Sequence, residues 1–409
     1  MVDLRQYAVV TAAYWGFTLT DGALRILVLL HFHALGYSPL ELAFLFLLYE
    51  FFGIVTNLLG GWLGSRFGLK PTLYCGLGLQ VYALYMLSLL DPAWDKLVGV
   101  GFVVATQGLS GVAKDLTKMS AKSAMKLVVP GDVHSVLFKW VAILTGSKNA
   151  LKGVGFFLGA TLLAGLGFVY TLWAMAAGLA VILLFVMLLL PGNMGKAKSK
   201  VKFTKILSKS RAINQLSAAR FFLFGARDVW FVVGVPIFLY EMIGWNFMEV
   251  GAFMAAWVIG YGGVQVMTPS FVRQSSDGRS SETRAAQWWA FALAALPVAI
   301  VGLIEAGVDP VASVVGGLAM FGVVFAINSA VHSYLILSFS GADKVALNVG
   351  FYYMANAGGR LIGCLFSGLS YQMWGLAGCL LTASTMILAA GAITVLLTNE
   401  HGSKAVVKA

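Results

Sequence analysis

The sequence predicts an all-α integral membrane protein with twelve membrane-spanning helices in two pseudo-symmetric halves of six. Three observations support this fold class: the apolar composition, the spacing of the apolar segments, and the distribution of basic residues among the loops. Of the 409 residues, 59% are hydrophobic and only 11% are charged, and the mean hydropathy is +0.86. A soluble protein has roughly a quarter of its residues charged, so most of this surface must face lipid.

Twelve apolar segments have the length that a helix needs to cross a bilayer, about 20 residues. They fall near residues 7–34, 39–64, 71–90, 97–118, 136–163, 167–190, 213–240, 247–271, 286–305, 311–338, 347–370 and 374–397. The loops between them are short except at 191–212, which is rich in Lys and Arg. We therefore predict an N-terminal half over 1–190, a basic cytoplasmic linker over 191–212, a C-terminal half over 213–400 and a cytoplasmic tail over 401–409.

The basic residues predict that both termini are cytoplasmic. With the N-terminus inside, 18 Lys and Arg residues fall in cytoplasmic loops and tails, whereas the external turns contain one, Lys96. This asymmetry agrees with the positive-inside rule, and an odd number of spans would have scrambled it. The net charge of +11 therefore indicates membrane orientation, and we expect no nucleic-acid partner.

A weak internal repeat supports the two halves. A shift of 208 residues aligns Gly36, Tyr37, Glu41, Tyr49 and Asn57 with Gly244, Trp245, Glu249, Trp257 and Gln265. Two six-helix halves joined by a basic loop are typical of rocker-switch carriers, in which the substrate site lies between the halves near mid-membrane.

Nine basic and four acidic residues remain inside the predicted spans. They are Arg25, Lys114, Lys118, Lys139, Lys148, Lys152, Arg220, Arg227 and Arg360, against Asp21, Glu50, Asp115 and Asp228. Each central charge costs about 2.5–3.5 kcal/mol on insertion scales. The surplus of cations predicts a wet cavity whose counter-charge arrives with the substrate. Lys118 and Lys139 are more simply explained by snorkelling at the cytoplasmic mouth.

Helical spacing groups these charges and leaves alternatives open. Asp21 and Arg25 are four residues apart, so a neutralised structural pair competes with a binding role. Lys148 and Lys152 are one turn apart and repel each other unless an anion or acid lies between them.

Polar residues four apart form a stripe on the predicted helix 347–370, and a shorter one, Asn328 and His332, lies on 311–338. The longer stripe comprises Asn348, Tyr352, Asn356 and Arg360. Such a stripe lines a cavity or makes a polar helix contact, and we expect the cavity.

These residues predict a site for a small organic anion. Arginine binds tetrahedral oxyanions through two parallel hydrogen bonds, and lysine adds a mobile charge, so Arg25 and Arg227 could clamp one anion while Lys148 and Lys152 hold another. The candidate substrate-binding residues are Arg25, Lys114, Lys148, Lys152, Arg220, Arg227, Tyr352, Asn356 and Arg360. The candidate proton carriers are Asp21, Glu50, Asp228 and His332.

The sequence offers no sign of an enzyme. Cys75, Cys364 and Cys379 have no paired spacing, and neither a metal-ligand pattern nor a nucleophile–base constellation is present. We expect no cofactor, no metal, no catalytic residue and a monomeric protein. A sensor or structural membrane protein would not require cations spread over both halves.

The predicted 2–3 turn reads Gly61-Trp62-Leu63-Gly64-Ser65-Arg66-Phe67-Gly68-Leu69-Lys70. It resembles the major facilitator signature, with Gly61, Arg66, Gly68 and Lys70 at matching positions, and this implies the major facilitator fold and a gating turn. Ser65 stands where the signature usually has Asp, so a gating ion pair built on that Asp lacks its acid. A Gly/Arg turn without a special role is the alternative.

Three longer segments carry a more specific resemblance. Residues 14–25, 138–153 and 220–230 resemble the organoarsenical efflux permeases of arsenic-resistance operons. The resemblance implies export of 1-arseno-3-phosphoglycerate across a bacterial inner membrane. We expect this export to be coupled to protons, with exchange against inorganic phosphate as the alternative coupling. A cytoplasmic glyceraldehyde-3-phosphate dehydrogenase makes this ester from arsenate. An organophosphate/phosphate antiporter, with the same cationic site, is the alternative.

Overall fold

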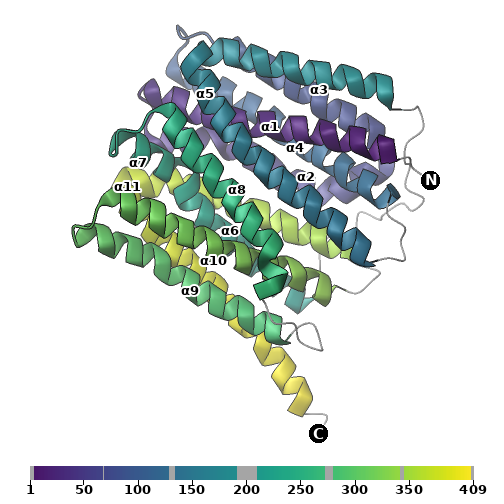
Figure 1. The fold of residues 1–409 in the computed structure, drawn as a ribbon, viewed down its shortest axis with the longest axis vertical. Helices are drawn as coiled ribbons and strands as arrows, with labels where there is room; N and C mark the ends of the chain where they lie inside the picture. Colours follow the sequence, from purple (N-terminus) through teal and green to yellow (C-terminus); the bar gives the residue numbers. More distant parts are fainter. Residues whose placement is uncertain are drawn as a thin grey trace. The chain divides into compact units, whose positions relative to one another are not determined.

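The computed structural model describes residues 4–67, 69–128, 134–190, 210–271, 280–340 and 345–406. All regular elements in these ranges are helices (Figure 1). They are α1 (Leu4–Ala34), α2 (Pro39–Phe67), α3 (Leu69–Ser88), α4 (Lys96–Val128), α5 (His134–Leu189), α6 (Arg211–Val229), the π-helical turn η2 (Trp230–Gly234), α7 (Val235–Glu241), α8 (Phe247–Phe271), α9 (Ser280–Glu305), α10 (Pro310–Phe339) and α11 (Val345–Val406).

Each of the twelve predicted spans corresponds to a helical segment. Two helices contain two spans each, because Gly167 (φ 76°) interrupts α5 and Gly375 (φ 62°) interrupts α11. Within the described residues, nine stretches are long and apolar enough to cross a membrane, and two of these include the interrupting glycines. Helix α3, with 20 residues, supplies the remaining span. The predicted all-α membrane fold is confirmed.

The backbone repeats itself at the offset of 208 residues found in the sequence. Gly167 and Gly375 are one such pair, and Gly36 (φ 82°) and Gly244 (φ 79°) are another. All four have the left-handed conformation that glycine adopts without steric cost. The two halves therefore turn the chain in the same way at equivalent positions.

The same offset relates two helix starts. At α2, Ser38 N donates to Glu41 Oε2 over 2.8 Å and Glu41 N donates to Ser38 Oγ over 3.4 Å. At α8, Asn246 N donates to Glu249 Oε2 over 2.8 Å and Glu249 N donates to Asn246 Oδ1 over 3.0 Å. Both are capping boxes, which satisfy backbone donors at the first turn of a helix.

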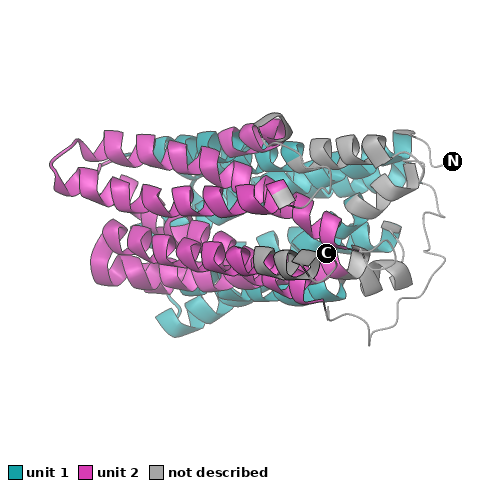
Figure 2. Ribbon diagram, turned by 90° about the horizontal axis from the view of Figure 1, so that it is seen from below, with its two compact units in different colours: residues 1–37, 44–203, 245–259 teal, residues 38–43, 204–244, 260–409 magenta. Residues whose placement is uncertain are grey.

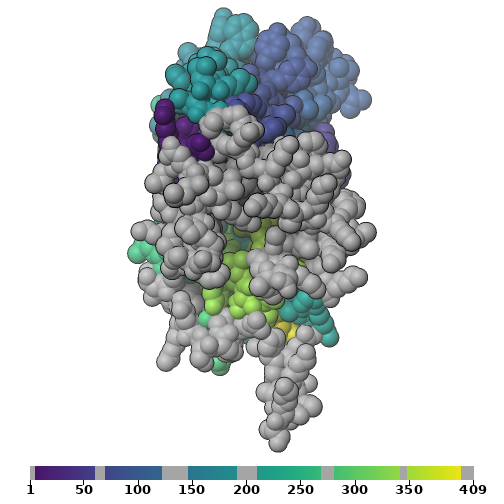
Figure 3. Space-filling model, turned by 90° about the vertical axis from the view of Figure 1, so that its right-hand side faces the viewer, coloured from purple at the N-terminus to yellow at the C-terminus, as the bar shows by residue number. Residues whose placement is uncertain are grey.

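The chain forms two compact units, coloured separately in Figure 2. The first comprises residues 1–37, 44–203 and 245–259, and the second comprises 38–43, 204–244 and 260–409. Residues 39–43 at the start of α2 thus belong to the second unit, and residues 247–259 of α8 belong to the first unit. The start of α1 is visible in purple on the face drawn in Figure 3.

In the first unit, α1 packs closely against α5 through glycines. A Cβ atom on Gly22 would lie 2.5 Å from Lys152 O, and one on Gly159 would lie 2.4 Å from Ala23 O. Only glycine allows the two backbones to approach this far, as in other small-residue contacts between membrane helices. This contact places the middle of α5 beside Asp21 of α1.

In the second unit, α6 packs against α11 in the same manner. A Cβ atom on Gly359 would lie 2.0 Å from Phe221 O, and one on Gly363 would lie 2.4 Å from Gly225 O. This approach aligns the charged part of α6 with the polar stripe of α11.

Helix α6 ends in a π-helical turn that the sequence pattern did not indicate. Pro236, which follows the turn, has no N–H to donate to the helix. The hydroxyl of Ser367 accepts hydrogen bonds from Val233 N (3.0 Å) and Gly234 N (3.2 Å). The widened turn starts two residues after Asp228, so it lies next to the charged residues of α6. π-Turns of this kind occur frequently at functional sites.

Candidate substrate-binding site

Six residues of the first unit form a group that we call the N-terminal cluster. They are Asp21 and Arg25 of α1, Tyr49 and Glu50 of α2, Lys114 of α4 and Lys152 of α5. Asp21, Arg25, Tyr49 and Glu50 are buried. All but Tyr49 were predicted from the sequence to bind substrate or carry a proton.

Arg25 pairs with an acid on the neighbouring helix. Its Nη1 donates to Glu50 Oε1 over 2.8 Å, and its guanidinium carbon lies 5.2 Å from the centre of the Phe46 ring. The alternative in which Arg25 forms a structural pair with Asp21, four residues earlier, is wrong. Helix packing brings Glu50 to Arg25, whereas Asp21 points to other partners.

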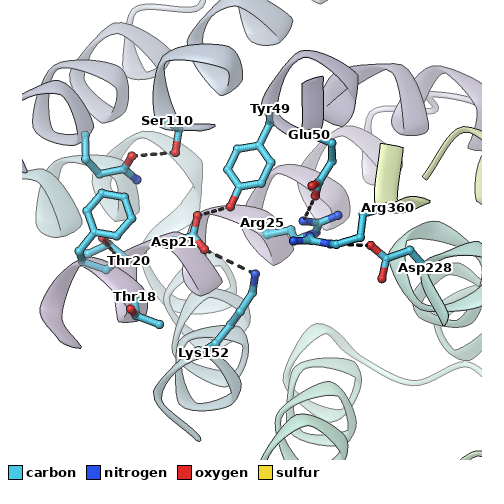
Figure 4. Close-up of polar contacts among 12 residues, drawn as sticks. Thr18, Thr20, Asp21, Arg25, Tyr49, Glu50, Ser110, Lys152, Asp228 and Arg360 are labelled. Atoms are coloured by element: carbon cyan, nitrogen blue, oxygen red, sulfur yellow. Dashed lines mark hydrogen bonds and ion pairs between the residues drawn. The ribbon is translucent and has the colours of Figure 1, made fainter. Parts of the chain in front are cut away.

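Asp21 is held by two side chains from two other helices. The Tyr49 hydroxyl donates to Oδ1 over 2.5 Å, and Lys152 Nζ lies 3.5 Å from Oδ2. Figure 4 shows the Tyr49 hydroxyl and the Lys152 ammonium group both directed at Asp21. The contact with Lys152 is long for a charge-assisted hydrogen bond, for which about 2.7–2.9 Å is usual.

The other lysines of this half lie beside the cluster. Lys114 Nζ is 3.8 Å from the centre of the Tyr49 ring, a cation–π contact. Lys148, one turn before Lys152 on α5, is half-buried. Counting Lys114, Lys152 and Arg25 against Asp21 and Glu50, the N-terminal cluster contains more cations than acids.

A second ionic group ties α2 to α4. Asp115 is fully buried; it accepts a hydrogen bond from the Thr56 hydroxyl and one from Lys118 Nζ over 2.6 Å. Lys118 also donates to Asn57 Oδ1 over 2.8 Å. Lys118 is therefore a member of an interhelical network, and the prediction that it snorkels towards the cytoplasm is wrong.

In the second unit, Arg227, Asp228 and Arg360 form a triad. Arg227 Nε donates to Asp228 Oδ1 over 2.7 Å, and Arg360 Nε donates to Asp228 Oδ2 over 3.0 Å. Asp228 is buried, with 1% of its surface exposed. One carboxylate thus lies between two guanidinium groups.

Arg220 lies two turns before Arg227 on the same helix, and its partners are neutral. Its Nε donates to Asn356 Oδ1 (2.9 Å), and its Nη1 donates to the backbone oxygen (3.0 Å) and hydroxyl (3.1 Å) of Ser329. Its guanidinium carbon is 3.7 Å from the Phe224 ring centre, and only 4% of the residue is exposed. In the described part of the chain, Arg220 makes no salt bridge.

We call these residues, Arg220, Arg227, Asp228, Ser329, Asn356 and Arg360, the C-terminal cluster. Phe224 connects its two parts, since the Arg227 guanidinium carbon also lies 5.0 Å from that ring. Arg220 and Arg227 therefore share a face of α6, as their spacing of seven residues indicates.

The polar stripe on α11 forms a polar helix contact, which was the alternative to the expected cavity lining. Asn356 and Arg360 bind residues of α6, and Asn348 Nδ2 donates to Ser340 Oγ over 3.1 Å. Tyr352 is fully buried in an apolar group with Val331 and Leu335, and its ring centre lies 5.1 Å from the Arg220 guanidinium carbon. Tyr352 thus packs behind Arg220.

His332 is buried. Neither of its ring nitrogens has a hydrogen-bond partner in the described chain, and the same holds for both polar atoms of Asn328, one turn earlier. Phe325, on the same face of α10, packs against Phe224 of α6, so this face is directed at α6. His332 remains a proton-carrier candidate on sequence grounds.

The gating turn is only partly described. Gly61 and Arg66 belong to α2, but their surroundings, together with Gly68, lie outside the described residues. Lys70 Nζ donates to Leu190 O over 2.8 Å and lies 5.4 Å from the Tyr74 ring centre. Among described residues, no three His, Cys, Asp or Glu side chains are arranged to hold a metal ion.

The sequence did not reveal Tyr49 and Ser329, which form hydrogen bonds to charged residues of the two clusters. Tyr49 precedes Glu50 and aligns with Trp257 in the internal repeat, but neither feature indicates that its hydroxyl contacts Asp21. Ser329 carried no signal, because a serine next to Asn328 in an apolar helix has no distinctive pattern.

Comparison with known proteins agrees with the fold. A family model described as Major Facilitator Superfamily matches residues 8–364. No curated protein sequence matches the chain.

Solved structures of transporters have the same fold. A POT family transporter in complex with a thioalcohol-conjugated peptide is 13% identical, with a TM-score of 0.73, covering 97% of this chain and 96% of that one. The nucleoside transporter NupG is 15% identical, with a TM-score of 0.69 and coverage of 98% and 99%. A bacterial homologue of the iron transporter ferroportin is 14% identical, with a TM-score of 0.68 and coverage of 97% and 100%. The chain belongs to the Major Facilitator Superfamily and is a multi-pass membrane transporter.

Proposed function

We propose that this transporter exports a small organic anion, and that its biological substrate is the organoarsenical phosphate ester 1-arseno-3-phosphoglycerate. The observation that carries the proposal is Arg220, a buried cation with neutral partners. Burying an uncompensated charge is costly. A solute that brings a negative charge to Arg220 removes that cost, so the site favours an anion over a neutral or cationic solute.

The excess of basic residues in each of the two clusters supports an anionic solute. Each unit contains one cluster in which basic residues outnumber acids. The proposed ester carries an arsenate group at one end and a phosphate group at the other, and both are tetrahedral oxyanions that arginine forks and lysines bind well.

The direction and coupling of transport are part of the proposal. We place the N-terminus and the basic loops in the cytoplasm of a bacterium, because the positive-inside rule assigns loops rich in Lys and Arg to that side. Export then runs outward across the inner membrane, coupled to protons through Asp21, Glu50, Asp228 or His332. A cytoplasmic glyceraldehyde-3-phosphate dehydrogenase supplies the substrate.

The same cations also suit an organophosphate/phosphate antiporter. Phosphate and arsenate esters have the same charge and shape, so the clusters described above do not favour one over the other. The resemblance of residues 14–25, 138–153 and 220–230 to organoarsenical permeases favours the arsenical substrate.

Everted membrane vesicles that contain the protein test the proposal. Arsenate, glyceraldehyde-3-phosphate, NAD and the dehydrogenase are supplied outside, and arsenic accumulation inside is measured. We expect accumulation only when the dehydrogenase is present, and none in vesicles without the protein. Uptake of phosphate or glycerol 3-phosphate without arsenic accumulation would establish the antiporter instead. Accumulation of arsenate without the dehydrogenase would contradict an ester substrate.

A further inference from the structure

Tyr49 contacts three charged side chains of the N-terminal cluster at once. Its hydroxyl donates to Asp21 Oδ1 over 2.5 Å. Its ring centre lies 3.8 Å from Lys114 Nζ and 5.8 Å from the Arg25 guanidinium carbon. Only 4% of the residue is exposed. Tyr49 of α2 thus contacts charged residues of both α1 and α4, and Figure 4 shows its hydroxyl directed at Asp21.

The close approach of α4 to α2 fixes the position of Tyr49. A Cβ atom on Gly111 of α4 would lie 2.6 Å from Tyr49 O, so α4 approaches α2 closely at this residue. Lys114 follows Gly111 by three residues, almost one helical turn, and therefore lies on the same side of α4. The close contact at Gly111 thus places the Lys114 ammonium group over the Tyr49 ring.

Tyr49 satisfies its charged neighbours without neutralising them. A phenol hydroxyl is a neutral donor, so Asp21 gains a hydrogen bond at Oδ1 that does not cancel a lysine charge. Lys152 approaches Oδ2 only to 3.5 Å. A ring face attracts an ammonium group while leaving its charge intact. A carboxylate in place of Tyr49 would pair with Lys114 and reduce its attraction for an anion.

We propose that Tyr49 is a positioning residue for anion recognition: it engages Asp21 and supports Lys114, so that Lys114 and Lys152 retain their affinity for an anionic solute. The inference rests on the proposed function and adds to it a residue that determines affinity. Without the hydroxyl, Asp21 turns more fully to Lys152, and that lysine binds the solute less well.

Two variants separate the hydroxyl from the ring. Tyr49→Phe keeps the ring under Lys114 and removes the hydrogen bond to Asp21, and Tyr49→Leu removes both. In everted vesicles, with the dehydrogenase-made ester as the transported solute, we expect Tyr49→Phe to raise KM about tenfold, the effect of one hydrogen bond to a charged group, with little change in maximal rate. Tyr49→Leu should raise KM further. Unchanged KM in both variants would overturn the proposal.

Tyr74→Phe is the matched control. Tyr74 lies in the same unit, its hydroxyl donates to Val186 O over 3.4 Å, and a lysine, Lys70, lies near its ring. Tyr74 contacts no residue of the N-terminal cluster in the described chain, so the KM of the Tyr74→Phe variant should equal that of the wild type. A rise in KM equal to that of Tyr49→Phe would show a general effect of losing a tyrosine hydroxyl and would overturn the proposal.

A measurement without substrate distinguishes failure of this inference from failure of the proposed function. Lys152→Met is introduced into the wild type and into Tyr49→Phe, and the melting temperature of each purified protein is measured. We expect Lys152→Met to lower the melting temperature more in Tyr49→Phe, because Asp21 then depends on Lys152. Equal decreases in melting temperature would show that the Tyr49 hydroxyl does not stabilise Asp21, and would overturn the inference. If wild-type vesicles take up no anion while the decreases differ, the proposed function fails and the link from Tyr49 to Asp21 and Lys152 stands.

Discussion

Replacing Arg220 with methionine is expected to abolish anion uptake while lowering the stability of the protein only modestly. Arg220 is buried and bound only to Asn356 and Ser329, so the substitution leaves no acid without its partner. It also removes the desolvation cost of a buried cation. Ser329 Oγ keeps neighbours, since Tyr261 Oη is 3.4 Å and Gln265 Nε2 is 3.5 Å away.

The loss of uptake should be at least about thirtyfold, the effect of removing one partner from a desolvated charge pair with the solute. The free energy of unfolding should fall by only about 1–3 kcal/mol, because Asn356 Oδ1 and Ser329 O lose a hydrogen-bond donor. Uptake in everted vesicles and the melting temperature of the purified protein measure the two quantities. Arg220→Lys, which keeps the charge but loses the planar fork, should retain partial uptake.

Two outcomes would contradict this role of Arg220. Normal uptake by Arg220→Met would show that the solute does not need this charge. Loss of uptake together with a large fall in melting temperature would show that Arg220 is a structural link between α6, α10 and α11.

Replacing Asp228 with asparagine should destabilise the protein strongly, unlike the replacement of Arg220. Asp228 lies between Arg227 and Arg360, and asparagine has nearly the same shape without the charge. Two half-buried guanidinium groups then face each other without their shared anion. We expect the free energy of unfolding to fall by about 3–5 kcal/mol, as is usual when one partner of a buried ion pair is removed.

An added anion should rescue the Asp228→Asn variant. A ligand that binds only the folded state raises the melting temperature, and phosphate or glycerol 3-phosphate can replace the lost carboxylate. We expect a larger rise in this variant than in the wild type. Asp115→Asn is the matched control, because Asp115 is an equally buried acid paired with Lys118 in the network between α2 and α4. Equal rescue of both variants would contradict an anion site at the triad.

The sequence predicted the helices because they depend on local properties. An apolar segment of about 20 residues has few alternatives to a membrane helix. The repeat at an offset of 208 residues also survives in the backbone, since Gly36 and Gly244 share a left-handed conformation. The π-helical turn after Asp228 was not predicted, because it depends on Ser367, which belongs to another helix.

The charged residues of the site could be predicted, but not their partners. An isolated cation in an apolar segment is conspicuous, which is why Arg220 and Arg227 were found. Whether Arg25 binds Asp21 or Glu50 depends on how α1 packs against α2, and sequence spacing along one helix suggested only Asp21 as a partner. Neutral partners such as Tyr49 and Ser329 are common residue types in membrane helices, and only their three-dimensional position distinguishes them.

A calorimetric titration of the purified protein tests directly whether the buried cations bind an anionic solute. Glycerol 3-phosphate is titrated into the wild type, with glycerol as the uncharged control and Arg220→Met as the variant control. We expect saturable binding of glycerol 3-phosphate to the wild type, none of glycerol, and at least about thirtyfold weaker binding to the variant. Binding of glycerol as tight as that of its phosphate, or binding by Arg220→Met as tight as by the wild type, would contradict this expectation.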